Sequence, residues 1–280
     1  MGGNPHVLLI DCSDQKGIVH KVTGVLYRWN LNIEEQGEFV DHLSKHFFMR
    51  TVIRGGLDAS SVLKELKEHV PTDAVLRLEE LRTKKIVILA SKEAHCLGDL
   101  LIRDHYGELN AEILAVLSNH SILEDLARKF NTPFICISHG HKTRAQYDEE
   151  VLAILKNYRV DYLILARYMR ILSDRFVNVY TNRIINIHHS FLPAFSGAKP
   201  YHQAYQRGVK IIGATAHFVT ADLDQGPIIA QDVISIGHSK TPEQLMQAGR
   251  DVEKTVLAKA LRLVFEERVF VHQNRTIIFD

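Results

Sequence analysis

The stretch KIVILAS at residues 85–91 is an unbroken apolar run with the length of one strand. Comparable runs follow it along the chain: AEILAVLSN at 111–119, FICIS at 134–138, YLILARY at 162–168 and RIINIH at 183–188. Intervening segments such as ILEDLARKFN and DEEVLAILKNY are typical of helices. Near-continuous apolar strands that alternate with helices indicate a parallel sheet covered on both faces. We therefore expect an α/β domain with a Rossmann-like, mostly parallel sheet.

The rest of this domain follows the same strands. Two runs at 211–219 and 227–236 lie closer together and predict an antiparallel pair at one side of the sheet. A long helix from 241 to about 267 and a terminal strand pair or tail complete the expected elements.

Residues 5–81 have a different pattern. HVLLIDC predicts a strand, and the stripe of Ile18, Val22, Val25 and Leu26 predicts a helix after it. Two strands, a second helix over DASSVLKELKEHV and a last strand over DAVLRLEEL should follow. This order, βαββαβ, is the ferredoxin-like split unit. We expect two domains, at 5–81 and 84–280, joined near the charged segment EELRTKK.

The composition restricts the possible partners. Lys and Arg number 34 against 33 Asp and Glu, so the net charge of +1 provides no overall field for nucleic acid or an anionic membrane. No apolar run is long enough for a membrane helix, and no basic segment of a signal peptide precedes the first strand. The three cysteines lack paired spacing and the sixteen histidines lack metal-ligand spacing. We expect a cytoplasmic protein with reduced thiols and no metal.

Polar residues crowd the end of the strand INIHHSFLP. Asn186 and His188 share one face by alternation, and the chain turns at once through Leu192 and Pro193. Ligands of open α/β sheets lie beyond the carboxyl ends of the strands. A lone histidine is more often a satisfied core residue, but the neighbouring amide on the same face favours a site.

A second polar cluster follows in HFVTADLDQGPIIAQD. We expect Asp222 to make a turn and Asp224 to point inward. An amide and an imidazolium can both donate to an oxygen that gains negative charge, and a carboxylate can hold the imidazole or move a proton. No GxSxG motif and no Cys beside a His is present, which indicates direct attack by water or an amine on a carbonyl.

NIHHSFLPAF, GATAHFV and LDQGPII, in this order, resemble the signature of the folate-dependent formyltransferases, and ARYMRILS resembles their folate-lining segment. The resemblance implies catalytic roles for Asn186, His188 and Asp224. It implies a folate substrate rather than a separate cofactor. It also implies substrate contacts by a set of residues around the strand ends: Met169, Arg170, Ile171, Leu172, Val219 and Asp222.

The chain departs from the transferases at the acceptor. Glycinamide ribonucleotide transferases have a Gly-rich loop that holds phosphate, whereas residues 91–95 here contain no glycine and include the anionic Glu93. His189 stands where the transferases commonly carry Pro or Ala. His189 and His202, in the following loop, are therefore possible further site residues.

DQKGIVHKVTGVLYRWNLNI resembles an ACT domain, and an ACT domain before a formyltransferase-like domain is the arrangement of the formyltetrahydrofolate deformylases. This resemblance implies hydrolysis of 10-formyltetrahydrofolate and a homo-oligomer. The ACT-like part is either a packing domain or an amino-acid effector site, with Asp14, Gly17 and Asn32 as candidate ligand contacts.

Three other functions remain open from the sequence. A formyltransferase with a small amine or sugar-nucleotide acceptor would require that acceptor for turnover. A nicotinamide-dependent dehydrogenase with an ACT domain is disfavoured because no GxGxxG follows a strand. A non-catalytic amino-acid sensor is disfavoured by the intact set of Asn186, His188 and Asp224.

Overall fold

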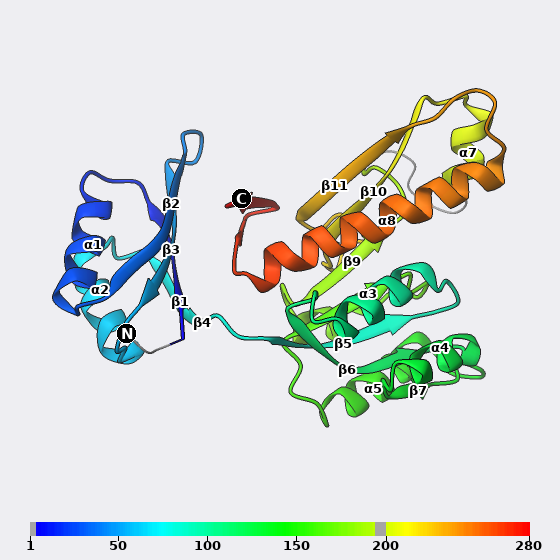
Figure 1. Cartoon of the computed structure of the whole chain (residues 1–280), viewed down its shortest axis with the longest axis horizontal. Coiled ribbons are helices and arrows are strands. Elements are labelled where there is room, and N and C mark those ends of the chain that lie inside the picture. Colours follow the sequence, from blue (N-terminus) through cyan, green and yellow to red (C-terminus); the bar gives the residue numbers. More distant parts are fainter. Residues whose placement is uncertain (1–3, 194–199) are drawn as a thin grey trace. The chain divides into compact units, whose positions relative to one another are not determined.

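The computed structural model describes residues 4–193 and 200–280, except for the side chains of residues 200 and 202. The chain forms two compact units. Unit 1 consists of Met1–Arg82, Glu266–Phe270 and Phe279–Asp280, and unit 2 consists of Thr83–Phe265 and Val271–Ile278. Figure 1 shows the helices and strands of each unit.

Unit 1 contains the six elements expected from its sequence, in the expected order. They are β1 (His6–Ser13), α1 (Ile18–Arg28), β2 (Asn32–Asp41), β3 (His46–Arg54), α2 (Ala59–His69) and β4 (Val75–Glu80). The strands form an antiparallel sheet in the order β2-β3-β1-β4. The predicted apolar stripe of α1 is buried and packs with Val62 and Leu66 of α2 in one core.

The C-terminal part of the chain corrects the expected domain boundary. Arg50 donates hydrogen bonds from Nε to the carbonyl of Glu267 and from Nη2 to that of Glu266, both at 3.0 Å. The ring of Phe270 packs edge-on against Phe48, with the centroids 5.5 Å apart. Residues 266–270 thus belong to unit 1, so treating 84–280 as one domain was wrong at this end.

Unit 2 is built around one sheet. Among the described residues its seven strands have the order β11-β10-β9-β8-β5-β6-β7. The strands from β9 to β7 in this order are parallel, and β10 and β11 are antiparallel to their neighbours, as predicted. Strand order reverses between β5 and β8, which makes the carboxyl ends there a topological switch point.

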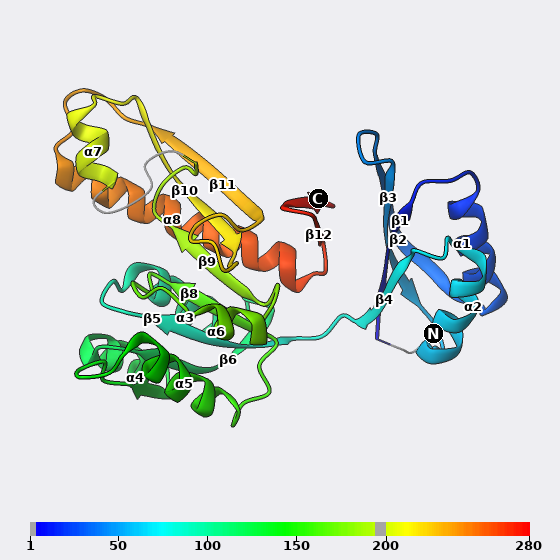
Figure 2. The ribbon, with the colours of Figure 1, turned by 180° about the vertical axis from the view of Figure 1, so that it is seen from behind.

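The elements of unit 2 alternate along the chain. Its strands are β5 (Lys84–Ala90), β6 (Ala111–Ser118), β7 (Phe134–Cys136), β8 (Tyr162–Ala166), β9 (Ile184–His188), β10 (Ile211–Phe218) and β11 (Ile228–Ser235). Near the C-terminus β12 (Val269–His272), whose first two residues belong to unit 1, pairs with β13 (Arg275–Ile278) of unit 2. Its helices are α3 (His95–His105), η1 (Ser121–Leu123), α4 (Glu124–Lys129), α5 (Arg144–Leu155), α6 (Asp174–Val179), α7 (Pro200–Gln206) and α8 (Pro242–Phe265). Helices α3 and α8 lie on one face of the sheet, and α5 and α6 lie on the other (Figures 1 and 2).

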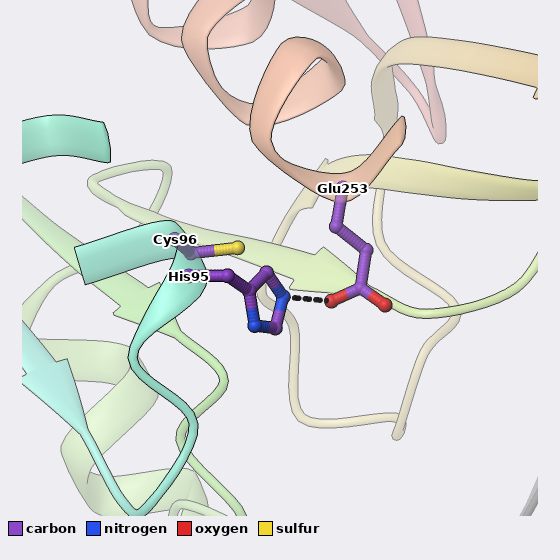
Figure 3. A group of neighbouring side chains, drawn as sticks. All are labelled: His95, Cys96 and Glu253. Carbon is purple, nitrogen blue, oxygen red and sulfur yellow. Dashed lines mark hydrogen bonds and ion pairs between the residues drawn. The ribbon is translucent and has the colours of Figure 1, made fainter. Parts of the chain in front are cut away.

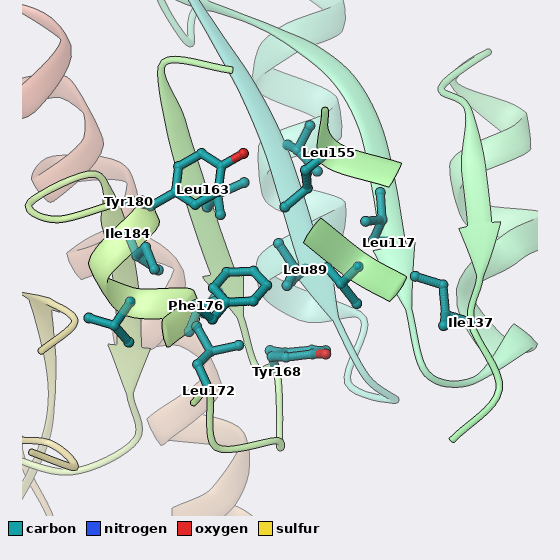
Figure 4. Packing of buried hydrophobic residues seen from close by; sticks show 14 of the residues in the cluster. Leu89, Leu117, Ile137, Leu155, Leu163, Tyr168, Leu172, Phe176, Tyr180 and Ile184 are labelled. Carbon is teal, nitrogen blue, oxygen red and sulfur yellow. The ribbon is translucent and has the colours of Figure 1, made fainter. Parts of the chain in front are cut away.

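A buried apolar cluster fixes the sheet against α5 and α6. Leu89, Leu117 and Leu163 from three strands pack with Phe176 of α6 and Leu155 of α5 (Figure 4). Burial of large side chains contributes about 1.5–3 kcal/mol each. The strand ends beyond this cluster therefore have a rigid support.

The composition led to expectations about the cysteines and about membrane-spanning helices. Cys12 and Cys96 are buried free thiols and Cys136 is an exposed one. The described helices include none that is long and apolar enough to cross a membrane.

Candidate active site

A cavity of about 640 Å³ lies at the carboxyl ends of β8 and β9. All three residues that were assigned catalytic roles line this cavity. Five of the six expected folate contacts also line it, namely residues 169–172 and Val219. The remaining lining residues are Glu93, His95, Leu165, Arg167, Tyr168, Ile187, His189, Tyr201, His217, Thr220, Ala221, Leu223, Met246, Arg250 and Glu253.

Asn186 lies beside a histidine of the neighbouring strand. The antiparallel register pairs His217 of β10 with Asn186 of β9, and Asn186 Nδ2 is 3.2 Å from His217 Nε2. His217 Nδ1 is 2.9 Å from the carbonyl of Phe218, which can only accept. In neutral His217 the proton is therefore on Nδ1, and Nε2 accepts from one N–H of the Asn186 amide. The second N–H of that amide remains for a ligand.

His188 and Asp224 form the charged part of the site. His188 Nδ1 is 3.3 Å from Asp224 Oδ1, and His217 Nε2 is 3.7 Å from the same oxygen. Hydrogen bonding from His188 lowers the pKa of Asp224 well below its usual value, although burial opposes this shift. Asp224 is thus a carboxylate that orients His188. The buried His188 Nε2 has no partner among the described residues and remains for a ligand.

The loop between β10 and β11 holds Asp224 in place. Asp224 has a φ of 55°, in the left-handed region that Asp tolerates better than most residues. Gly226 approaches the carbonyl of Phe218 so closely that an added Cβ would lie 1.7 Å from its oxygen. Only glycine fits there, and this close approach folds the loop back over β10.

A buried threonine fixes the chain beyond β9. Thr215 Oγ1 donates to the carbonyl of Ser190 and accepts from the N–H of Leu192 and from Gln231 Nε2, at 2.9–3.0 Å. Gln231 Nε2 also lies 3.0 Å from the carbonyl of Leu192. The turn after His188 and His189 is therefore tied to β10 and β11.

The expected folate segment follows β8. The N–H of Met169 donates to Ser91 Oγ at 3.0 Å, and the guanidinium of Arg170 stacks on the ring of Tyr147 at 4.1 Å. The exposed side chains of Met169 and Ile171 lie at the same cavity as exposed Leu223. This apolar rim suits a flat, aromatic ligand.

Asp222, His189 and His202 are the remaining residues that the sequence placed at the site. Asp222 does not line the cavity; its carbonyl accepts from Thr220 Oγ1 and from the N–H of Gln225, as expected of a turn residue. The rings of His188 and His189 lie close together, with centroids 5.2 Å apart, where β9 ends at His188. His202 lies in α7, and its side chain is outside the described residues.

The three candidate effector contacts are exposed residues of unit 1. Gly17, with a φ of 86°, precedes α1, and the N–H of Asp14 donates to the carbonyl of Lys45. Asn32 begins β2, opposite Arg54 of β3.

A second polar group lines the same cavity and was missed from the sequence. Glu253 Oε2 lies 2.7 Å from His95 Nε2, and its Oε1 accepts from Tyr201 Oη at 2.7 Å. His95, Cys96 and Glu253 come close together where α3 begins beside α8 (Figure 3). His217 of the first group was also missed, although a histidine inside the apolar run GATAHFV was a usable signal.

The chain is similar to several known proteins. The family model described as "Formyl transferase" matches residues 84–261. The chain is 52% identical to a formyltetrahydrofolate deformylase of Haemophilus influenzae over 97% of this chain and 98% of that one, and equally identical to that of Escherichia coli strain K12, over 97% of each. The crystal structure of a formyltetrahydrofolate deformylase from Pseudomonas syringae superposes with a TM-score of 0.95 at 42% identity, over 100% of this chain and 95% of that one.

His189 should make the protein less stable in mild acid. Burial, followed by the charges of Arg167 and His188, lowers the pKa of His189 from 6.5 to about 4. Between these two pH values the unfolded chain takes up a proton that the folded chain does not, so the free energy of unfolding falls as the pH falls. His189→Gln should remove about 2 kcal/mol of this decrease. Urea unfolding at pH 7.5 and pH 4.5 measures it.

The exposed His238 in the same unit gives the matched control His238→Gln. Equal pH dependence in wild type and His189→Gln would contradict the prediction.

Proposed function

The chain belongs to the formyltetrahydrofolate deformylase family, and we propose that Asn186, His188 and Asp224 carry out the hydrolysis of 10-formyltetrahydrofolate to formate and tetrahydrofolate. The observation that carries the proposal is the 3.3 Å contact between Asp224 and His188. This contact leaves the buried His188 Nε2 for a ligand, beside the free N–H of the Asn186 amide. Unit 2 has the mostly parallel sheet of the formyltransferase type, and the enzyme is a hydrolase.

The reaction begins with addition of water to the formyl carbon. The water oxygen forms a bond to this carbon while the carbonyl oxygen becomes an oxyanion, which Asn186 Nδ2–H and protonated His188 stabilise. Asp224 holds the imidazole through Nδ1 and accepts a proton from the attacking water, directly or through a second water. The oxyanion then collapses, the bond from carbon to N10 breaks, and N10 receives the proton. Formic acid loses its remaining acidic proton at neutral pH and leaves as formate.

Water is the acceptor that this cavity suits. The described lining residues include no serine or cysteine that could act as a nucleophile. Glu93, at the position of the expected phosphate loop, pairs with Arg250 at 2.8 Å and brings an anion into the cavity wall. Both features favour direct hydrolysis over transfer to a phosphorylated amine.

The pterin of the folate would lie on the apolar rim formed by Met169, Ile171 and Leu223. Leu172 and Val219 continue this surface inside the cavity. The reaction as written requires no cofactor and no metal. We place the enzyme in the cytoplasm, in keeping with its free thiols.

Unit 1 is proposed to be an ACT domain, because its βαββαβ order and sheet are those of that module. We propose that it pairs with a second copy in a homo-oligomer. An amino acid bound near Asp14, Gly17 and Asn32 would then alter turnover. The exposed left-handed Gly17 allows a ligand to approach the backbone closely.

Asp224→Asn should abolish most turnover while folate binding persists, because the amide cannot take the proton. Formate release from 10-formyltetrahydrofolate without an added amine should fall by about 100- to 10,000-fold. The exposed Asp232 provides the control Asp232→Asn, which should retain wild-type turnover. Release that begins only after an amine is supplied would identify a transferase instead.

His188→Ala should lower kcat by about 100- to 1,000-fold, since it removes one donor to the oxyanion. The dissociation constant for tetrahydrofolate should change little, because the apolar rim remains. Steady-state kinetics and fluorescence titration measure the two quantities. A change confined to KM would assign His188 to binding rather than to the chemical step.

Equilibrium dialysis against the twenty amino acids tests the effector site. One of them should bind at millimolar concentration or below and change the rate of formate release. Asn32→Ala should weaken this binding by about tenfold, as expected for one lost hydrogen bond. Absence of binding for all twenty would leave unit 1 as a packing domain.

A further inference from the structure

The second polar group lies beside His189, just after β9 ends. Asn186 and His188 share the face of β9 that carries the buried Ile184 of the α5 and α6 core. His189 follows directly after the end of β9, and its ring is 6.2 Å from that of Tyr201. Glu253 of α8 accepts from Tyr201 on this side. The cavity thus has two polar walls, one with the proposed reaction machinery and one that the reaction as written does not use.

Glu253 is the fixed centre of the second wall. It is only 1% exposed, and its two carboxylate oxygens are occupied by Tyr201 and His95. Burial alone would favour the neutral acid, but the hydrogen bond from His95 and the charge of Arg167 lower the pKa of Glu253 below its usual value. An added Cβ at Gly249, one turn earlier in α8, would lie 2.1 Å from Tyr201 Oη, so glycine makes room for this contact.

Arg167 is held against Glu253 in an unusual conformation. It follows β8 directly with a φ of 60°, which an L residue other than Asn or Asp rarely adopts. Its side chain is 13% exposed, and its Nε lies 3.4 Å from Glu253 Oε2. This buried Nε has no hydrogen-bond acceptor among the described residues. Non-glycine residues in this region cluster at ligand sites, where the surrounding structure enforces the conformation.

The other two arginines of the cavity are engaged elsewhere. Arg250 donates to Glu93 at 2.8 Å, and Arg170 stacks on Tyr147. The buried Nε of Arg170 also has no hydrogen-bond partner among the described residues, so Arg167 differs from the other two in its left-handed backbone and its position beside Glu253. A guanidinium presents five donors in a planar fork that matches a carboxylate.

The group formed by His95, Cys96 and Glu253 is not a convincing metal site. Their possible ligand atoms lie within 4.8 Å of one another (Figure 3). However, both Glu253 oxygens already accept hydrogen bonds, the Arg167 cation is adjacent, and burial raises the pKa of the Cys96 thiol. A cation would have to compete with Arg167, whereas an anion would not.

Hydrolysis produces such an anion in this cavity. Formate forms within reach of the Asp224 carboxylate, which repels it, and Arg167 in the second wall of the same cavity offers a cation. We propose that Arg167, aligned by Glu253, forms a subsite for a small carboxylate and receives the formate released from the formyl group. The inference rests on the proposed function, because that function supplies the formate. Glu253 is in this role a positioning residue.

The same fork could bind a second carboxylate, that of the glutamate in the folate substrate. The two sources make different predictions. A formate subsite affects binding of formate to the complex with tetrahydrofolate, whereas a glutamate subsite affects binding of tetrahydrofolate but not of tetrahydropteroate, which lacks glutamate. The position of Arg167 beside His189 and Glu253, rather than on the exposed rim, favours formate.

The test compares Arg167→Gly and Arg167→Lys with wild type. Glycine adopts a φ of 60° without strain. Arg167→Gly therefore removes the guanidinium and leaves the backbone in a conformation that glycine readily adopts. Arg250→Gln is the matched control, since it removes a cavity arginine that is already paired with Glu93. Circular dichroism verifies that each variant is folded. Binding of ¹³C-formate to the enzyme saturated with tetrahydrofolate is followed by NMR line broadening, and formate inhibition of turnover is measured separately.

Arg167→Gly should weaken formate binding by about 10- to 100-fold, the effect of losing charge-assisted hydrogen bonds. Arg167→Lys should weaken it less, because the charge remains without the fork. Arg250→Gln should change it by less than about threefold, within the range of a screened charge. Added guanidinium at millimolar concentration should restore formate binding to Arg167→Gly.

Unchanged formate binding in Arg167→Gly would overturn the proposal, as would a wild-type complex that binds no formate. Weaker binding of tetrahydrofolate with unchanged binding of tetrahydropteroate would assign the fork to glutamate and also overturn it. The NMR measurement does not depend on turnover. An enzyme that binds formate through Arg167 but releases none from 10-formyltetrahydrofolate would refute the proposed function separately.

Discussion

The site depends on one half-buried carboxylate that must stay ionised. Asp224 keeps its charge because His188 Nδ1 lies 3.3 Å from its Oδ1 and donates to it. Burial alone would raise the pKa of this carboxylate and so favour its neutral form. The contact therefore fixes the ionisation of Asp224 and the tautomer of His188 together, and the geometry of the remaining site serves to maintain it.

The two antiparallel strands at the edge of the sheet provide this contact. A purely parallel sheet would end with the carboxyl edge of β9, and Asp224 would have no element to bring it there. The antiparallel partner β10 sets His217 opposite Asn186 in register, and the loop after β10 folds back at Gly226. The chemistry thus combines a switch point, which is general to open α/β sheets, with a strand pair that is specific to this one.

The sequence predicted most of the framework and the first wall of the site. Apolar runs and their spacing were enough to predict the parallel strands, the antiparallel pair and the βαββαβ unit, because these depend on local periodicity. Asn186 and His188 were found because they interrupt an apolar strand at its end. The placement of residues 266–270 in unit 1 was not predictable, since it depends on Arg50, more than two hundred residues earlier.

The second wall shows why the rest could not be read from the chain. His95, Arg167 and Glu253 come from the start of one helix, the end of a strand and the middle of another helix. Each has an ordinary local explanation: a polar residue at a helix start, a charged residue after a strand, and a glutamate within a long helix. Their shared burial gives them meaning, because a guanidinium and a carboxylate that leave water together must satisfy each other or a ligand. In this cavity Glu253 is satisfied by two other donors and Arg167 is not, and this imbalance is a property of the tertiary structure alone.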